Sequence, residues 1–189
     1  MRIKLKDIAE LQSGVYLKAS ENASADKAYL LGLRDFDEEL EYLGTAVEVD
    51  RAEVKEKYIV EKHHVLFSSR LKFNAFSLPK NSPNTFIASS SFIIIKPNLK
   101  KVLSEYLIWF LNHPETQSEF SNLAQATSRV PYINLKKLEE IEIELPELAI
   151  QREIVHINRL RRKEKQLMQT LVQKKEQYIQ SILLKKSKQ

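Results

Sequence analysis

Short apolar runs separated by polar turns dominate the first hundred residues and predict β-strands. The segments AYLLG (28–32), HHVLFSSR (63–70) and FIASSSFIIIKP (86–97) are rich in Val, Phe and Ile, and TAVEVD (45–50) alternates apolar and polar positions. A polar stretch with two prolines, 78–85, predicts a loop. At the amino end we expect a short strand, then a helical turn that begins near Asp7 and ends at Gly14.

Helical spacing replaces this pattern after residue 103. The segment 104–124 has a wide apolar face, with Ser104 as the expected cap and Pro114 as either a break or the start of a second helix. A helical turn (133–140) and a strand (141–145) follow, and the strand alternates Ile or Leu with Glu. Strands and helices alternate without a regular βαβ repeat, so the pattern predicts a mixed α/β domain of the α+β type.

A long helix is predicted from about residue 147 to residue 186, where no proline or glycine interrupts the chain. At 35 to 40 residues it would extend roughly 55 Å. Its apolar positions lie mostly three, four or seven apart, a narrow stripe that needs a partner helix. We therefore expect a domain at 1–147 and a coiled-coil arm at 148–189. The residues expected to form its dimer contact are Ile157, Leu160, Leu167, Leu171, Tyr178 and Ile182.

Charge is distributed unevenly along the chain. Residues 151–189 hold eleven Lys or Arg and three Glu, whereas residues 1–150 hold nineteen basic and twenty-two acidic residues. The sequence pI of about 9.2 therefore comes from the arm. Within the domain, residues 62–104 contain seven basic residues and no acid. This segregation predicts one basic face for a polyanion, with ordinary solvated surface charge as the alternative.

The sequence lacks the residues that several kinds of active site require. The chain has no cysteine, and its three glycines form no phosphate-binding loop. His63 and His64 are adjacent, so on a strand they would point to opposite faces and not share a metal. Glu142 and Glu144 suit a solvated strand face better than a catalytic pair. We expect no catalytic residue, metal or cofactor. Without a signal peptide or a membrane-length apolar run, a soluble cytoplasmic protein is expected.

Basic and aromatic residues in polar loops are the better functional signal. Arg, Ser and Lys side chains bind bases and phosphates, and such residues recur at three places in the chain. The candidate DNA-binding residues are Tyr16 and Lys18, Arg70 and Lys72, and Ser128, Arg129 and Tyr132.

The order of these elements resembles one half of a DNA specificity subunit of type I restriction-modification systems. The resemblance rests on KLKDIAELQSG, the VLFSSR strand, SEYLIWFLN and, most specifically, residues 124–154. There a polar turn precedes an I-x-x-x-x-L helix, an I-x-I-x-x-P strand and a P-x-x-x-x-Q-x-x-I pattern, matched by Pro146, Gln151 and Ile154. His63 and His64 replace a glycine-aspartate pair that is usual in the family.

The resemblance implies a target recognition domain that reads a half-site in duplex DNA, followed by a spacer helix. Full subunits carry two such domains and two helices, whereas this sequence has one of each. It implies homodimerisation through the helix, and docking of adenine methyltransferase subunits, with a restriction subunit as a further partner. Catalysis would belong to those partners. An RNA-binding protein with a basic arm, or a structural coiled-coil adaptor, remains an alternative.

Overall fold

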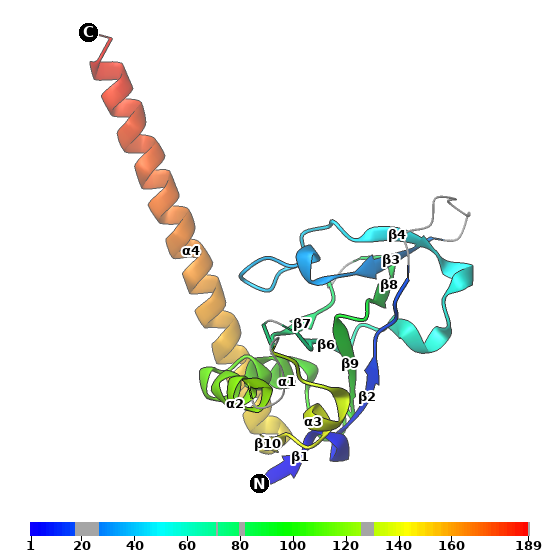
Figure 1. The fold of residues 1–189 in the computed structure, drawn as a ribbon. Helices are drawn as coiled ribbons and strands as arrows, with labels where there is room; N and C mark the ends of the chain where they lie inside the picture. The colour runs from blue at the N-terminus through cyan, green and yellow to red at the C-terminus, as the bar shows by residue number, and fades with distance from the viewer. Residues whose placement is uncertain (18–26, 71, 80–81, 126–130, 189) are drawn as a thin grey trace. The chain divides into compact units, whose positions relative to one another are not determined.

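The computed structural model describes residues 1–17, 27–70, 72–79, 82–125 and 131–188. The chain divides into a globular unit, Met1–Gln151, and a second unit, Arg152–Gln189, which are described separately. In its described residues the globular unit forms two four-stranded sheets and a two-stranded ribbon (Figure 1). A mixed α+β fold followed by a long helix was expected, and the structure confirms it.

The first sheet is fully antiparallel, with strand order β2-β9-β6-β7. Its two central strands are almost completely buried, because each is a continuous apolar run with neighbours on both sides. These strands are β2 (Ala9–Ser13), β6 (Val65–Ser68), β7 (Ala75–Ser77) and β9 (Phe92–Pro97).

The second sheet has the order β4-β3-β8-β5, in which β3 and β8 are parallel and the other pairs antiparallel. Buried side chains of both sheets form one core cluster that includes Leu31, Phe76, Phe86 and Ile94. The ring centroids of Phe36 and Phe76 lie 4.5 Å apart in this cluster. The strands are β3 (Lys27–Leu31), β4 (Val47–Asp50), β5 (Ile59–Val60) and β8 (Thr85–Ala88).

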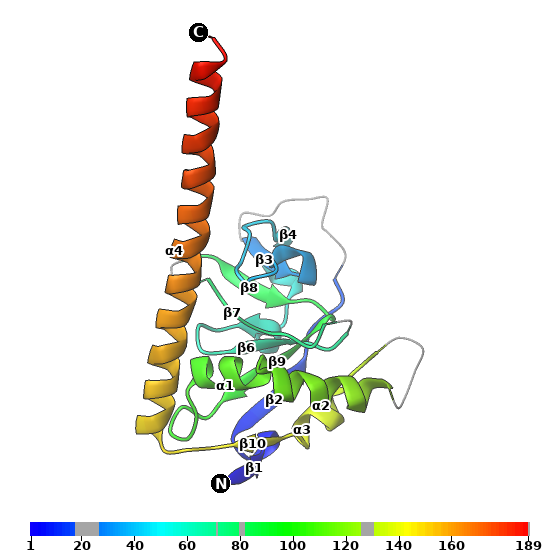
Figure 2. The same ribbon diagram turned by 90° about the vertical axis from the view of Figure 1, so that its left-hand side faces the viewer.

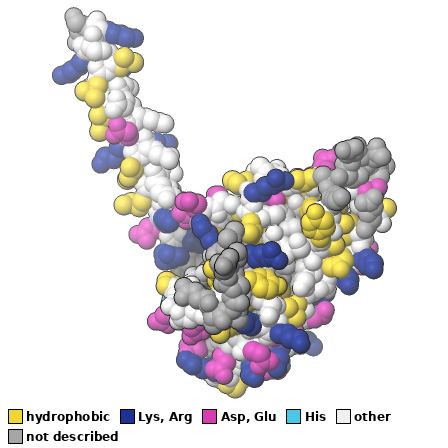
Figure 3. Space-filling view, viewed as in Figure 1, with side chains coloured by type: hydrophobic (Ala, Val, Ile, Leu, Met, Phe, Trp, Pro, Cys, Tyr) yellow, Lys and Arg dark blue, Asp and Glu magenta, His cyan; other side chains and the backbone are white. Residues whose placement is uncertain are grey.

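A two-stranded ribbon joins the two ends of the globular unit. Strand β1 (Arg2–Lys4) pairs antiparallel with β10 (Glu142–Glu144). Arg2 forms ion pairs with both glutamates of β10, and Lys4 and Lys6 both bind Glu140. Basic and acidic side chains therefore alternate at this end of the unit (Figure 3). Glu142 and Glu144 are exposed while Ile143 is buried, as the alternating pattern predicts.

Lowering the pH should weaken this ribbon. The ammonium groups of Lys4 and Lys6 lower the pKa of Glu140 from its usual 4.5 to about 2. A carboxylate with a lowered pKa stabilises the fold above its unfolded pKa, and this contribution disappears as the pH falls from about 4.5 to about 2. Urea unfolding across this range should show the loss. Glu140→Gln should remove this part of the pH dependence, and an unchanged profile would contradict the assignment.

The part of the globular unit that the structure describes also holds the helices α1 (Ser104–Leu111), α2 (Pro114–Gln125) and α3 (Leu135–Glu139) and four short 3₁₀ turns. Helix α1 packs against β6 and β7, and α2 follows it directly (Figure 2). Pro114 starts α2, which settles the alternative that the sequence left open. The Asn134 side chain caps α3 by accepting a hydrogen bond from the Lys137 N–H (2.9 Å).

Helix α4 (Leu148–Lys186) runs for 39 residues, close to the predicted bounds. Its first turn belongs to the globular unit, whereas the sequence placed the boundary at 147/148. The six residues of the expected dimer contact are between 38% and 68% exposed. Among the described residues, no helix has the length and hydropathy needed to cross a membrane.

Three local expectations were wrong. The helical turn ends at Asp7, where it was expected to begin, and residues 9–13 form β2, because antiparallel pairing with β9 outweighs a weak local preference. The run 86–97 forms two strands separated by a turn at 90–91. Leu103 is the cap residue of α1, and the Ser104 hydroxyl instead donates to the His63 carbonyl (2.7 Å).

Candidate nucleic-acid interface

Arg70 and Tyr132, 62 residues apart in sequence, meet at the end of β6. They form an isolated antiparallel bridge, and the Arg70 Cζ lies 5.3 Å from the centroid of the Tyr132 ring. The neighbouring Ile133 N–H donates to the Ser69 carbonyl (3.0 Å), which aligns the two segments. Both side chains of the pair are exposed. A guanidinium stacked on an aromatic ring keeps its N–H groups free at the edge and loses little rotamer freedom on binding.

A tight turn after β6 adds Lys72 to this pair. The Ser68 hydroxyl and the Lys72 N–H both donate to the Arg70 carbonyl, at 2.9 and 2.8 Å. Lys72 is exposed, so two exposed positive charges lie two residues apart in this turn, and one of them, Arg70, lies over the Tyr132 ring. We call Arg70, Lys72 and Tyr132 the basic cluster.

Tyr16 lies at the same end of the first sheet as the basic cluster. Both segments bind the turn at 90–91 that separates β8 from β9. The Ser69 N–H donates to the Ser91 carbonyl (3.1 Å) on one side of the turn, and the Val15 N–H donates to the Ala88 carbonyl (2.9 Å) on the other side. Tyr16 is 76% exposed. Four of the seven predicted DNA-binding residues therefore lie at one end of the sheet. The other three, Lys18, Ser128 and Arg129, fall outside the described residues.

Arg70 and Lys72 have no carboxylate partner among the residues that the structure describes. Ion pairs neutralise many other cations of the globular unit: Arg2, Lys4, Lys6, Lys27, Arg51 and Lys96 each bind a glutamate. Arg70 instead contacts a neutral ring. An unpaired cation can bind a phosphate or a base without first breaking an internal ion pair.

The single basic face predicted for residues 62–104 is not observed. Lys62 and Lys100 lie at the start of β6 and the end of β9, whereas Arg70 and Lys72 lie beyond the end of β6. Antiparallel pairing places these two groups at opposite ends of the sheet. The acid-free segment therefore forms two separate basic patches.

His63 and His64 precede β6 in a turn and not on a strand. The His64 Nδ1 accepts a hydrogen bond from the Glu61 N–H (3.0 Å), and burial lowers the pKa of this imidazole. Within the described ranges, no three His, Cys, Asp or Glu side chains converge as metal ligands would.

Comparison with known proteins agrees with the order of elements expected from the sequence. The family described as the type I restriction modification DNA specificity domain matches residues 1–177. The chain belongs to this family. The HindI specificity subunit of Haemophilus influenzae, a type I restriction enzyme component, is 26% identical over 103 residues. Those residues are 53% of this chain and 22% of that protein.

Solved structures of type I specificity subunits share the fold. The HsdS subunit of Thermoanaerobacter tengcongensis matches with a TM-score of 0.64 at 18% identity, over 90% of this chain and 39% of that one. The S subunit of M. genitalium matches with a TM-score of 0.55 at 13% identity, over 83% and 37%. This specificity domain thus spans well under half of those relatives. Membership of a family of specificity domains agrees with the expectation that the chain is not an enzyme.

The motif that carries the resemblance has a structural role at Gln151. This side chain is fully buried, and its Oε1 accepts a hydrogen bond from the Leu103 N–H (2.9 Å). Its Nε2 donates to the carbonyls of Lys101 (3.0 Å) and Pro146 (2.8 Å). One amide thereby ties the first turn of α4 to the segment that precedes α1. The sequence motif identified Gln151 but not this role, because two of its three partners, Lys101 and Leu103, lie about 50 residues away.

Replacing Gln151 with leucine should destabilise the globular unit by about 2 kcal/mol. The substitution keeps the size of the side chain but leaves a buried N–H and two carbonyls without partners. The free energy of unfolding in urea measures the loss. Exposed Arg152, its neighbour, provides the control, since Arg152→Leu should change stability by less than about 0.5 kcal/mol. Equal effects of the two substitutions would contradict this role.

Proposed function

We propose that this specificity domain reads part of a DNA duplex through the basic cluster of Arg70, Lys72 and Tyr132. The observation that carries the proposal is the stacked, exposed Arg70–Tyr132 pair, which no carboxylate neutralises in the described part of the chain. Membership of a family of DNA specificity domains supports it. Tyr16, at the same end of the sheet, would extend the surface.

The chemistry of each side chain suggests a separate role. An arginine donates two parallel hydrogen bonds to O6 and N7 of guanine, which is the commonest specific contact in the major groove. Tyr132 would hold Arg70 in one orientation before DNA arrives. Lys72 would contact a phosphate, which fixes position but carries no sequence information. Lys18, Ser128 and Arg129 remain proposed contacts on sequence grounds.

Removing the cluster should weaken the binding of duplex DNA. We expect Arg70→Ala to reduce affinity for a preferred duplex by about ten- to a hundredfold, as loss of a bidentate base contact does. Lys72→Ala should weaken all duplexes equally and lower the salt dependence of binding by about one counterion. Fluorescence anisotropy over a range of salt concentrations measures both effects.

The second basic patch provides a matched control. Lys62→Ala with Lys100→Ala removes two exposed charges at the opposite end of the same sheet. We expect this double variant to lower DNA affinity less than Arg70→Ala does and to leave the sequence preference unchanged. Equal losses would indicate binding through net charge alone. Tighter binding of structured RNA would favour an RNA-binding protein, and absence of any binding would favour an adaptor.

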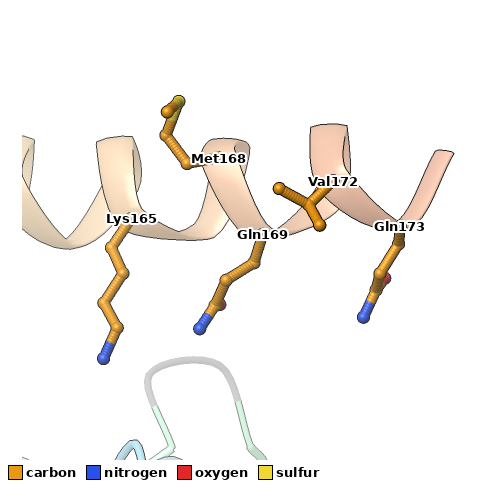
Figure 4. A pocket seen from close by; sticks show the side chains of 5 residues that line it. All are labelled: Lys165, Met168, Gln169, Val172 and Gln173. Atoms are coloured by element: carbon orange, nitrogen blue, oxygen red, sulfur yellow. The ribbon is translucent and has the colours of Figure 1, made fainter. Parts of the chain in front are cut away.

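We further propose that α4 acts as a spacer that pairs with the α4 helix of a second copy. The six apolar side chains of the expected dimer contact support this, since each is exposed on the single chain. Figure 4 shows Lys165, Gln169 and Gln173 pointing to one side of α4 and Met168 pointing away from them. Two copies related by a two-fold axis would read two half-sites of a symmetric, interrupted sequence.

Docking of adenine methyltransferase subunits, and of a restriction subunit, also belongs to the proposal. The excess of Lys and Arg on the arm offers a surface for such partners. Methylation and cleavage would then be reactions of those subunits, and this chain would select the DNA sequence at which they act.

A further inference from the structure

The segment that carries Arg70 and Lys72 is held by two amide side chains from the junction of α1 and α2. Asn112, directly after α1, faces Ala75 at the start of β7. Its Oδ1 accepts a hydrogen bond from the Ala75 N–H (2.9 Å), and its Nδ2 donates to the Ala75 carbonyl (2.7 Å). Strand β7 is the last strand of its sheet, so this amide supplies the partners that a further strand would supply.

Gln117, in the first turns of α2, makes the second attachment. Its Nε2 donates to the carbonyls of Phe73 (2.8 Å) and Leu111 (2.6 Å). Leu111 ends α1, so one amide joins that helix end to the chain next to Lys72. Phe73 is 4% exposed, and its ring centroid lies 6.2 Å from that of Phe120 on α2. Attachment by an amide and by a buried ring leaves the segment after Lys72 little freedom.

Two further hydrogen bonds join this segment to the end of β6. The Ser68 N–H donates to the Asn74 carbonyl (2.8 Å), and the Ser68 hydroxyl donates to the Arg70 carbonyl. Arg70 and Lys72 are thus presented between a strand on one side and two helix-borne amides on the other. Base contacts lose most of their energy when a side chain is displaced by a fraction of an ångström, so such support matters for a site that reads sequence.

We infer that Asn112 and Gln117 are positioning residues for DNA reading. They do not contact DNA themselves, and they act by fixing the backbone from which Arg70 and Lys72 project. The inference rests on the proposed function of the basic cluster. It assigns the α1–α2 junction a role in sequence discrimination.

A double-mutant cycle tests the inference on the full chain, with a short duplex selected by that chain from a random library as the probe. Gln117→Met should weaken binding of the selected duplex about tenfold and reduce its preference over random duplexes. In the Arg70→Ala background the same substitution should add less than about twofold, because it acts through Arg70. A fully additive loss in the double variant would overturn the inference.

Gln12 supplies the matched control, because its Nε2 also donates to a backbone carbonyl, that of Lys57 (2.7 Å). Gln12→Met should lower thermal stability while leaving DNA preference unchanged, and an equal loss of preference would also overturn the inference.

If Gln117→Met does not fold, Asn112→Asp replaces it. This substitution keeps the shape of the side chain and the hydrogen bond from the Ala75 N–H, but the new carboxylate cannot donate to the Ala75 carbonyl. If Arg70→Ala has no effect, the proposed function fails. If Arg70→Ala weakens DNA binding but Gln117→Met and Asn112→Asp do not, the proposed function stands and the inference about the two amides fails.

Discussion

Replacing Gly14 with alanine is expected to destabilise the globular unit by about 3 kcal/mol or more, because the site has no room for a side chain. A Cβ built on Gly14 would lie 2.1 Å from the carbonyl oxygen of Ser89 and 2.6 Å from that of Ala88. Both atoms belong to the backbone, so no flexible side chain can move aside. The Gly14 N–H also donates to the Phe92 carbonyl (2.9 Å), which fixes its distance from this turn.

Gly32 offers a control for this substitution. A Cβ there would lie 3.6 Å from the Asp35 carboxylate, an ordinary contact, so Gly32→Ala should cost less than about 1 kcal/mol. Urea unfolding of both variants measures the difference. Because Gly14 holds the chain beside Ser89, Gly14→Ala should also displace Tyr16 and lower DNA affinity. A Gly14→Ala protein as stable as the Gly32→Ala protein would show that the close approach is absent in solution.

Introducing charge at Leu167 and Leu171 is expected to convert a dimer into a monomer. The two residues lie four apart on α4, so they share one face, and they are 61% and 53% exposed on the single chain. In a paired helix each would fill a hole between four side chains of the partner. Two glutamates at these positions would bury unpaired charge, which costs several kcal/mol, more than a two-helix contact can offset. Sedimentation velocity gives the molecular mass directly.

The neighbouring pair Gln166 and Thr170 provides the control, because these polar residues have the same spacing on a different face of α4. Gln166→Glu with Thr170→Glu adds the same charge and should leave the dimer intact. If the unsubstituted protein is a monomer, or if both variants dissociate equally, Leu167 and Leu171 do not form the dimer contact. The leucine variant should also bind a symmetric site more weakly, since each monomer then engages one half-site alone.

Local sequence pattern was sufficient to predict most elements but not their mutual arrangement. The bounds of α4 followed from a stretch without proline or glycine, and β10 followed from its alternating residues. Residues 9–13 were expected to be helical because their pairing with β9, which lies 80 to 88 positions away, leaves no local pattern in the sequence. Long-range strand pairing also divides the basic residues of 62–104 between two ends of a sheet. Strand topology, and not distance along the sequence, decides which charges are neighbours.

The interface shows the same limit. Arg70 and Tyr132 were identified separately as exposed residues of binding type, but their contact depends on the bridge between two distant segments. Asn112 and Gln117 were missed. An asparagine at a helix end and a glutamine inside a helix are common, and only the position of Ala75 and Phe73 gives these amides their partners. Gln151 belongs to a recognisable sequence motif, but its contacts with the segment before α1 were not predicted.

The most direct test of the central claim is selection of duplexes from a random DNA library by the full chain at low salt, with structured RNA as competitor. The account predicts enrichment of a two-fold symmetric sequence interrupted by a spacer, and loss of that enrichment with Arg70→Ala. Recovery of no common sequence, or displacement of the DNA by RNA, would contradict it.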